Sequence, residues 1–345
     1  MGNDFWDDPR TIGLIGGVLL LVGAATVLVR LLKNRDESGL NTAMIEMFRR
    51  RIRAWWVLCT VLAAAFLFGQ TVTVVLFGLI SFWALREFIT LTPTRPGDHR
   101  ALFWVFFLLT PLQFVSVGLL NYKPDAPDLS TWQAMLRTLG SFEFFSIMIP
   151  VYGFLFVLAR VAIAGDYKRF LERAAKIQAG LLICVYCLSH APAILTLNSP
   201  EYLPNWGSKA RFLFFFVLMV QLSDALQYAW ARIPSKHPIV PTINPNKTWE
   251  GLLGGSLSTV LLGSALWWAT PFHGRYWWMA GVMSLVISLM SFAGSITLSA
   301  IKRDRGVKDY GTLVEGHGGV LDRIDSICFA APVFYHLTLW WLGAG

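Results

Sequence analysis

The residues best suited to chemistry lie between positions 299 and 326, where charged side chains crowd into an otherwise apolar chain. Ser299 and Lys302 are three residues apart at the end of an apolar run, so a helix would place them on one face. The basic cluster of this segment, which could attract a phosphate group, comprises Lys302, Arg303, Arg305 and Lys308. Because charge of this density beside a bilayer is costly, the segment indicates a phosphate-binding site.

Three carboxylates in the same segment could hold a metal ion. Asp309 follows the basic cluster, and Asp322 and Asp325 stand three residues apart at the mouth of the last apolar run, with Arg323 between them. Carboxylates combined with substrate phosphates are the usual ligands of Mg²⁺. The plainer alternative is a solvated loop in which Asp322 and Asp325 suit the positive end of a helix dipole. The alternation of acidic and basic residues favours the metal and phosphate site.

A glycine-rich turn separates the basic cluster from the last two carboxylates. His317 stands among Gly316, Gly318 and Gly319. Glycines at this density permit the close backbone approach that anion-binding turns require. We expect His317 either to donate a hydrogen bond to a phosphate or to serve the turn itself.

Two further polar groups precede this segment. Asp224 lies about two turns before the end of an apolar run, with Ser223 beside it, and a carboxylate at membrane depth is more typical of a site than of a scaffold. The loop at 241–251 carries Lys247, a mobile point charge suited to phosphate, and Thr248, which is placed to cap the following helix. We expect these groups to share one membrane face with the 299–326 segment.

The elements that must position these residues are membrane helices. Of 345 residues, 55% are hydrophobic and only 14% charged, against roughly 25% charged residues in soluble proteins. The predicted fold is all-α, a polytopic transmembrane helix bundle of about ten spans. The apolar runs lie at 12–32, 55–69, 71–91, 101–120, 140–159, 177–197, 210–231, 251–270, 276–299 and 327–344. The first follows an acidic flank and is interpreted as a retained helix rather than a signal peptide.

The distribution of basic residues predicts the orientation of the bundle. Most of the 29 Lys and Arg residues fall in alternate loops, at 33–54, 92–100, 160–176, 232–249 and 302–325. Such loops stay in the cytoplasm, so we expect both termini on the non-cytoplasmic side and the candidate site on the cytoplasmic face. The expected location is a bacterial-type inner membrane. The net charge of +8 then reflects orientation and contact with membrane lipids, and no nucleic-acid module is seen.

The chain is predicted to form one integrated membrane domain with two regions. Residues 1–200 would form the scaffold and face lipid, and residues 201–345 would form the catalytic region. Arg86 and Glu87 lie near the end of the third apolar run. Their side chains could reach the interface by snorkelling or belong to a site, and both interpretations stay open.

Taken together, these motifs resemble the phosphatidate cytidylyltransferases, also called CDP-diacylglycerol synthases. The C-terminal signature of that family reads S-x-hydrophobic-K-R-x₄-K-D-x-small, then G-H-G-G-hydrophobic-x-D-R-hydrophobic-D. This sequence matches it at Ser299, Ile301, Lys302, Arg303, Lys308, Asp309, Gly311, Gly316, His317, Gly318, Gly319, Asp322, Arg323, Ile324 and Asp325. Two shorter stretches of the family, S-P-x-K-T-x-E-G and D-x-x-A-Y, resemble residues 244–251 and 224–228.

Three positions depart from the family pattern. Glu315 stands where the family usually has Pro, Gln227 where it has Ala, and Asn244 where it has Ser. The groups expected to bind metal and phosphate are retained. The reaction type is therefore expected to follow the family, whereas the identity of the lipid acceptor is left open.

The resemblance implies an enzyme of phospholipid biosynthesis that converts CTP and phosphatidic acid to CDP-diacylglycerol and pyrophosphate. The implied cofactor is Mg²⁺, with a second cation left open, and the ligand candidates are Asp224, Asp309, Asp322 and Asp325. The implied catalytic residues are Asp309, Asp322, Lys302, Lys308, Ser299 and His317. The residues expected to bind substrate phosphates are Lys247, Arg303, Arg323, Ser223 and Thr248.

Other functions stay open at this level. The partners implied are CTP, phosphatidic acid or a related lipid phosphate, and membrane lipids, with a homodimer undecided. Cytidylyl transfer to a different lipid phosphate is one alternative, and a non-catalytic paralogue that binds anionic lipid or transports a solute is another. A transporter predicts charges at the bilayer midplane, whereas this chain places its charge at one face.

Overall fold

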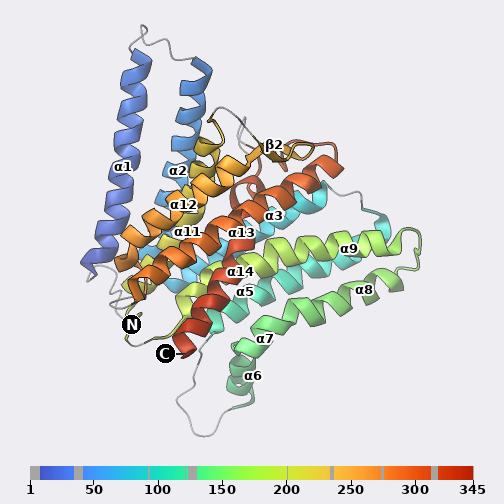
Figure 1. The fold of residues 1–345 in the computed structure, drawn as a ribbon. Coiled ribbons are helices and arrows are strands. Elements are labelled where there is room, and N and C mark those ends of the chain that lie inside the picture. Colours follow the sequence, from blue (N-terminus) through green and yellow to red (C-terminus); the bar gives the residue numbers. More distant parts are fainter. Residues whose placement is uncertain are drawn as a thin grey trace.

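The chain was analysed as a computed structural model, and its helices form a tilted bundle (Figure 1). The structure describes residues 8–34, 42–91, 94–120, 122, 130–199, 201–233, 237–272, 276–311 and 318–344. The helices are α1 (Pro9–Asn34), α2 (Thr42–Phe68), α3 (Gln70–Thr90), α4 (His99–Trp104), α5 (Thr110–Leu119), α6 (Thr131–Leu139), α7 (Phe142–Ile147), α8 (Phe154–Ile163), α9 (Phe170–Gly180), α10 (Leu188–Ala193), α11 (Trp206–Trp230), α12 (Trp249–Ala265), α13 (Trp277–Asp304) and α14 (Leu321–Ala344). The predicted all-α membrane bundle is confirmed.

Each predicted apolar run overlaps a helical segment of the structure. Among the described residues, eight segments are long and apolar enough to cross a membrane. They are Pro9–Val27, Gln70–Thr90, Pro96–Leu119, Phe142–Ile163, Phe170–Thr196, Trp206–Trp230, Trp277–Asp304 and Leu321–Gly343. The other two predicted runs correspond to the shorter apolar part of α2, Trp55–Phe68, and to α12, which has 17 residues. The count of ten spans stays a prediction.

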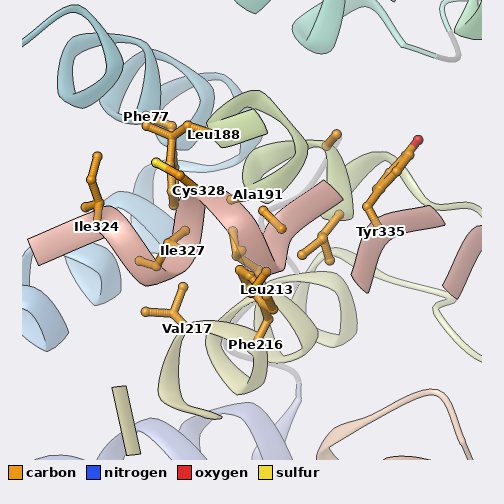
Figure 2. Close-up of a cluster of buried hydrophobic side chains, with 14 of the residues drawn as sticks. Phe77, Leu188, Ala191, Leu213, Phe216, Val217, Ile324, Ile327, Cys328 and Tyr335 are labelled. Atoms are coloured by element: carbon orange, nitrogen blue, oxygen red, sulfur yellow. The ribbon is translucent and has the colours of Figure 1, made fainter. Parts of the chain in front are cut away.

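Helix α14 is the central element of the fold. Its apolar side chains pack on α3, α10 and α11, as Figure 2 shows. Ile327 and Cys328 of α14 are almost completely buried, and Phe216 of α11 is fully buried. A helix that is apolar on nearly all sides is expected at the centre of a membrane bundle. The candidate site residues Asp322 and Asp325 therefore stand on a helix that packs against several others.

Glycines allow α12 to lie close against its two neighbours. A Cβ atom built on Gly255 would lie 2.7 Å from the backbone nitrogen of Gln227 in α11. A Cβ atom on Gly263 would lie only 1.8 Å from Oγ of Ser284 in α13. Small residues permit such close approach between membrane helices. The three helices thus pack closely and form one wall beside the site.

The loop between α11 and α12 contains a short hairpin that the all-α prediction did not include. Strands β1 (Pro238–Val240) and β2 (Asn244–Thr248) pair antiparallel, with Pro238 opposite Thr248. The backbone nitrogen of His237 donates to a carboxylate oxygen of Glu250 at 3.1 Å. Thr248 caps α12, as predicted, because its Oγ1 accepts the N–H of Gly251 at 3.0 Å. The hairpin projects over the end of α11.

Both ends of the bundle lie beside the start of α11. The carboxylate of Asp8, just before α1, pairs with Arg211. Near the end of α14, Trp341 packs on Tyr202 and Phe272. The start of α1 and the end of α14 therefore share one side of the bundle, away from the hairpin. This agrees with an even number of spans, and the membrane side of the termini stays a prediction.

The last helix begins before the predicted apolar run. Helix α14 begins at Leu321, whereas the apolar run suggested residue 327. Glu87 accepts the N–H groups of Val320 and Leu321 where the helix starts. Oδ2 of Asp322 accepts the N–H of Gly319, just before the helix, at 2.9 Å. Asp322 and Asp325 consequently belong to the first turns of the helix.

Candidate active site

A cavity of about 820 Å³ opens between α2, α3, α11, β2, α12, α13 and α14. Its polar lining includes Gln221, Asp224, Tyr228, Asn244, Lys247, Asp322, Arg323 and Asp325. Its apolar lining includes Val57, Val61, Leu62, Leu76, Phe77, Ile80, Val217 and Ile327. Val217 precedes Asp224 by about two turns of α11, roughly 10 Å along the helix. The cavity is therefore charged at one end and apolar at the other, and α2 and α3 contribute to it as well as the predicted catalytic region.

Asp224 and Asp325 bring two carboxylates to the charged end. Oδ2 of Asp224 accepts a hydrogen bond from the hydroxyl of Ser326 at 2.6 Å. Ser326 follows Asp325 in α14, and the two carboxylates are near enough to repel each other. Both line the cavity. A cation or a protonated substrate group would relieve this repulsion.

Lys247 supplies positive charge beside these carboxylates. Its Nζ lies 3.9 Å from Oδ1 of Asp224 and 3.4 Å from Oε1 of Gln227. The ammonium also stands 5.3 Å from the centre of the Phe292 ring, within range of a cation–π contact. The side chain of Lys247 is 15% exposed. It is thus held at the cavity wall, where its charge can face a phosphate.

Asp322 ties three segments of the site together. Its Oδ1 accepts from Nζ of Lys302 at 2.8 Å, which joins α14 to the end of α13. Its Oδ2 accepts the backbone N–H groups of Tyr310 at 2.8 Å and Gly319 at 2.9 Å. Burial raises the pKa of the Tyr310 phenol, so the hydroxyl keeps its proton and donates to the carbonyl of Leu298. Asp322 therefore organises the site as well as facing the cavity.

Asp309 and Asp322 both lie close to Gly318. A Cβ atom on Gly318 would stand 2.9 Å from Oδ2 of Asp322 and 3.5 Å from Oδ1 of Asp309. Gly318 also has a φ of 75°, a conformation that favours glycine. Gly318 thus stands beside two carboxylates that are 13 positions apart in the sequence.

Several predicted phosphate ligands have structural partners instead of a place on the cavity wall. Ser223 is fully buried, and its hydroxyl donates to Ser288 at 2.8 Å. Arg303 donates to the carbonyls of Ile243 at 3.2 Å and Val307 at 3.3 Å, so it holds the hairpin against α13. These two side chains therefore stabilise the helix and hairpin contacts around the site.

The remaining predicted residues have varied surroundings. Arg323 and Thr248 line the cavity, and the Thr248 hydroxyl is engaged in capping. Ser299 is buried in α13, whereas Lys308 is exposed. His317 lies outside the described residues.

Comparison with known proteins shows the family of the chain. Residues 49–341 match the cytidylyltransferase family. The chain belongs to this family. The uncharacterized protein YnbB of Escherichia coli K12 is 33% identical over 290 residues, which cover 83% of this chain and 85% of YnbB. A phosphatidate cytidylyltransferase of Staphylococcus epidermidis is 37% identical over 129 residues, 37% of this chain and 49% of that protein. One of Staphylococcus aureus matches equally over 128 residues.

The family assignment confirms the resemblance and fixes the class of chemistry. The cytidylyltransferase is a membrane nucleotidyltransferase, and its relatives support transfer of a cytidylyl group to a lipid. This chain spans about half the length of the staphylococcal enzymes it matches. The extensive likeness to YnbB agrees with a divergent branch of the family.

The residues of the cytidylyltransferase fit a metal site that substrate would complete. Among the residues the structure describes, no three His, Cys, Asp or Glu side chains gather to hold a metal ion by themselves. The four predicted Asp ligands form two pairs instead, Asp224 with Asp325 and Asp309 with Asp322. Mg²⁺ is usually held by one or two carboxylates together with substrate phosphates and water. The pair that lines the cavity suits this arrangement.

Two residues of the site were not among the predicted ligands. Gln227 is buried, and its amide donates to Ser223 and to Ser288 while its carbonyl faces Lys247. The departure of Gln227 from the family pattern was the signal that could have identified it.

Glu87 contacts the start of α14 from α3. The signal that could have identified Glu87 was a carboxylate within an apolar run. Arg86 beside it is exposed, as snorkelling predicts.

Proposed function

We propose that this cytidylyltransferase transfers the cytidylyl group of CTP to the phosphate of a membrane lipid, with phosphatidic acid as the first candidate acceptor. The products would be CDP-diacylglycerol and pyrophosphate. The observation that carries this proposal is the single cavity that is charged at one end and apolar at the other. Its volume of about 820 Å³ lies within the roughly 300–1,000 Å³ typical of small-molecule sites.

The chemistry needs no nucleophile from the protein. The acceptor phosphate is already an anion, and its oxygen attacks the α-phosphorus of CTP as the bond to pyrophosphate breaks. The enzyme must bring two polyanions together, align them and neutralise the charge on the leaving group. Lys247 and Arg323 provide positive charge at the cavity wall for this purpose.

Asp224 and Asp325 are the residues that would hold Mg²⁺. Bound there with the substrate phosphates, the ion supplies charge neutralisation for the triphosphate and its leaving pyrophosphate. Lys302 and Asp322 act differently, because their 2.8 Å ion pair joins α13 to α14. Asp309, which is exposed and lies close to Gly318, is available for phosphate-bound cations.

The apolar end of the cavity would take the lipid tails. Val57 and Val61 of α2 line it, and their side chains are 64% and 43% exposed on the surface of the bundle. A lipid can therefore enter sideways from the bilayer while CTP enters from the polar end. The basic loops support a reaction at the cytoplasmic face of a bacterial-type inner membrane.

A different lipid phosphate is the second candidate acceptor. Gln227 and Asn244 depart from the family pattern, and both line the cavity near Lys247. Side chains at this position contact the part of the substrate that carries the phosphate. The family reaction is compatible with either acceptor, because the same charged groups of the cavity would bind the phosphate of both lipids.

The test is pyrophosphate release by purified protein in mixed micelles with Mg²⁺. CTP is compared with ATP, and phosphatidic acid is compared with diacylglycerol, with an isoprenoid phosphate and with a lipid-free control. Mass spectrometry identifies the nucleotide-linked lipid. Release that requires both CTP and phosphatidic acid supports the first acceptor, and release with another lipid phosphate alone supports the second. Folded protein that releases no pyrophosphate with any pair overturns the proposal.

A further inference from the structure

Glu87 is a buried carboxylate that lies beside the active site but does not line its cavity. It belongs to the last turn of α3, and only 5% of the residue is exposed. A buried carboxylate is costly unless charged or hydrogen-bonding partners surround it. Its partners therefore show what the side chain does.

Both oxygens of Glu87 bind the backbone where α14 begins. Oε1 accepts the N–H of Val320 at 2.9 Å, and Oε2 accepts the N–H of Leu321 at 2.8 Å. The first N–H groups of a helix have no partner within the helix, and a negative charge is favourable there. Glu87 thus caps α14 from another helix, across more than two hundred residues of sequence.

Two glycines leave room for this carboxylate. A Cβ atom on Gly311 would lie 2.8 Å from Oε1 of Glu87, and a Cβ atom on Gly319 would lie 2.3 Å from Oε2. One glycine comes from the segment after α13 and the other from the segment before α14. The carboxylate is therefore enclosed by the two backbone segments that frame the glycine-rich turn.

The residue after Leu321 is Asp322, which lines the cavity of the active site. Asp322 follows Leu321 directly and accepts the N–H of Gly319. A helix turns by about 100° per residue. If the first turn of α14 rotated by even one residue position, the side chains of Asp322 and Asp325 would therefore turn away from the cavity. The contact with Glu87 keeps the first residue of α14 in place.

We propose that Glu87 is a positioning residue, which fixes the start of α14 and so orients the carboxylates of Asp322 and Asp325 toward substrate. The effect on turnover rests on the proposed cytidylyl transfer, whereas the effect on the backbone does not. A merely structural role would lower stability and leave the kcat of the folded protein unchanged. A positioning role lowers kcat with little change in KM for CTP.

The test compares Glu87→Gln with the matched control Glu143→Gln, in which an exposed carboxylate of α7 is replaced. Hydrogen exchange of a peptide covering residues 318–326 is measured without substrate. The Gln side chain has one acceptor oxygen and no negative charge, so it cannot replace both carboxylate oxygens. The rate of hydrogen exchange at Val320 and Leu321 should therefore rise on the order of tenfold over wild type. Turnover should fall roughly tenfold or more, with KM for CTP within about threefold. Glu87→Asp retains the charge and should recover part of both effects.

Gly319→Ala disturbs the same contact from the other side, and it replaces Glu87→Gln if that variant fails to fold. Its Cβ atom would meet Oε2 of Glu87, so the same faster exchange is expected. Unchanged exchange at Val320 and Leu321 in the folded variants would overturn the proposal. So would a destabilised Glu87→Gln variant whose folded fraction keeps the wild-type kcat. If the wild-type protein makes no pyrophosphate, the cytidylyl transfer fails, and the exchange measurement still decides how α14 is held.

Discussion

The ion pair between Lys302 and Asp322 should be essential for the stability of the site region. Nζ and Oδ1 are 2.8 Å apart, and the two side chains are only 15% and 11% exposed. Removing one partner of such a pair leaves a buried charge without compensation, which costs about 3–5 kcal/mol. Lys302→Met should therefore lower the free energy of unfolding by about 3 kcal/mol, the lower end, because some solvent reaches the pair.

Another ion pair of this chain supplies a matched control. Lys176 pairs with Glu172 one turn away on α9, but Glu172 is 43% exposed. Exposed pairs contribute only about 0–1 kcal/mol. Lys176→Met makes the same chemical change as Lys302→Met at a lysine of similar exposure, so the difference between the variants reports the burial of the carboxylate partner.

The assay is unfolding in detergent, followed by tryptophan fluorescence, for each single variant and for the double variant Lys302→Met with Asp322→Asn. Removing both charges should restore part of the stability, with a coupling energy of about 1–3 kcal/mol. If Lys302→Met is no more destabilising than Lys176→Met, or if the two single effects simply add, the Lys302 and Asp322 interaction does not hold the site together.

Three further outcomes are expected. Asp224→Asn and Asp325→Asn should each reduce Mg²⁺-dependent pyrophosphate release at least about a hundredfold, chelator should abolish it, and activity that survives either change contradicts the metal assignment. Val61→Trp narrows the apolar end of the cavity, so it should raise the KM for lipid and leave the KM for CTP unchanged when each substrate is titrated. An unchanged KM for lipid would show that the apolar end is not the lipid site. The hydrogen bond from His237 lowers the pKa of Glu250 to about 2 from 4.5. Its stabilisation is therefore present above pH 4.5 and lost toward pH 2, so the difference in unfolding midpoint between wild type and Glu250→Gln should shrink over that range.

Much of the site could be predicted from the sequence because its motifs consist of residues close together in the chain. The basic cluster after Ser299 and the carboxylates Asp309, Asp322 and Asp325 lie within one short segment. Thr248 was correctly predicted to cap a helix, since a cap depends on the residues that follow it. Apolar length likewise predicts membrane helices without knowledge of their neighbours. The hairpin was missed because its strands are short and β2 is polar. The apolar run begins after the start of α14 because the first turn of that helix is not apolar.

Which face of a helix meets the cavity could not be read from the sequence. Ser223 and Asp224 are adjacent, yet Ser223 is buried against Ser288 while Asp224 lines the cavity. The choice depends on how α11 is rotated against α12 and α13, and glycines at the interfaces set that rotation through close contact. The sequence alone could only place both residues near the site.

The sequence by itself determined the membrane helices, the family motifs and the class of reaction, because these depend on apolar length and on residues close together in the chain. The tertiary structure decided which charges meet. Asp322 finds Lys302 at the end of α13, and Glu87 finds the backbone of Val320 and Leu321 at the start of α14. The second contact joins residues more than two hundred positions apart, and it forms only because the packed bundle brings α3 against α14.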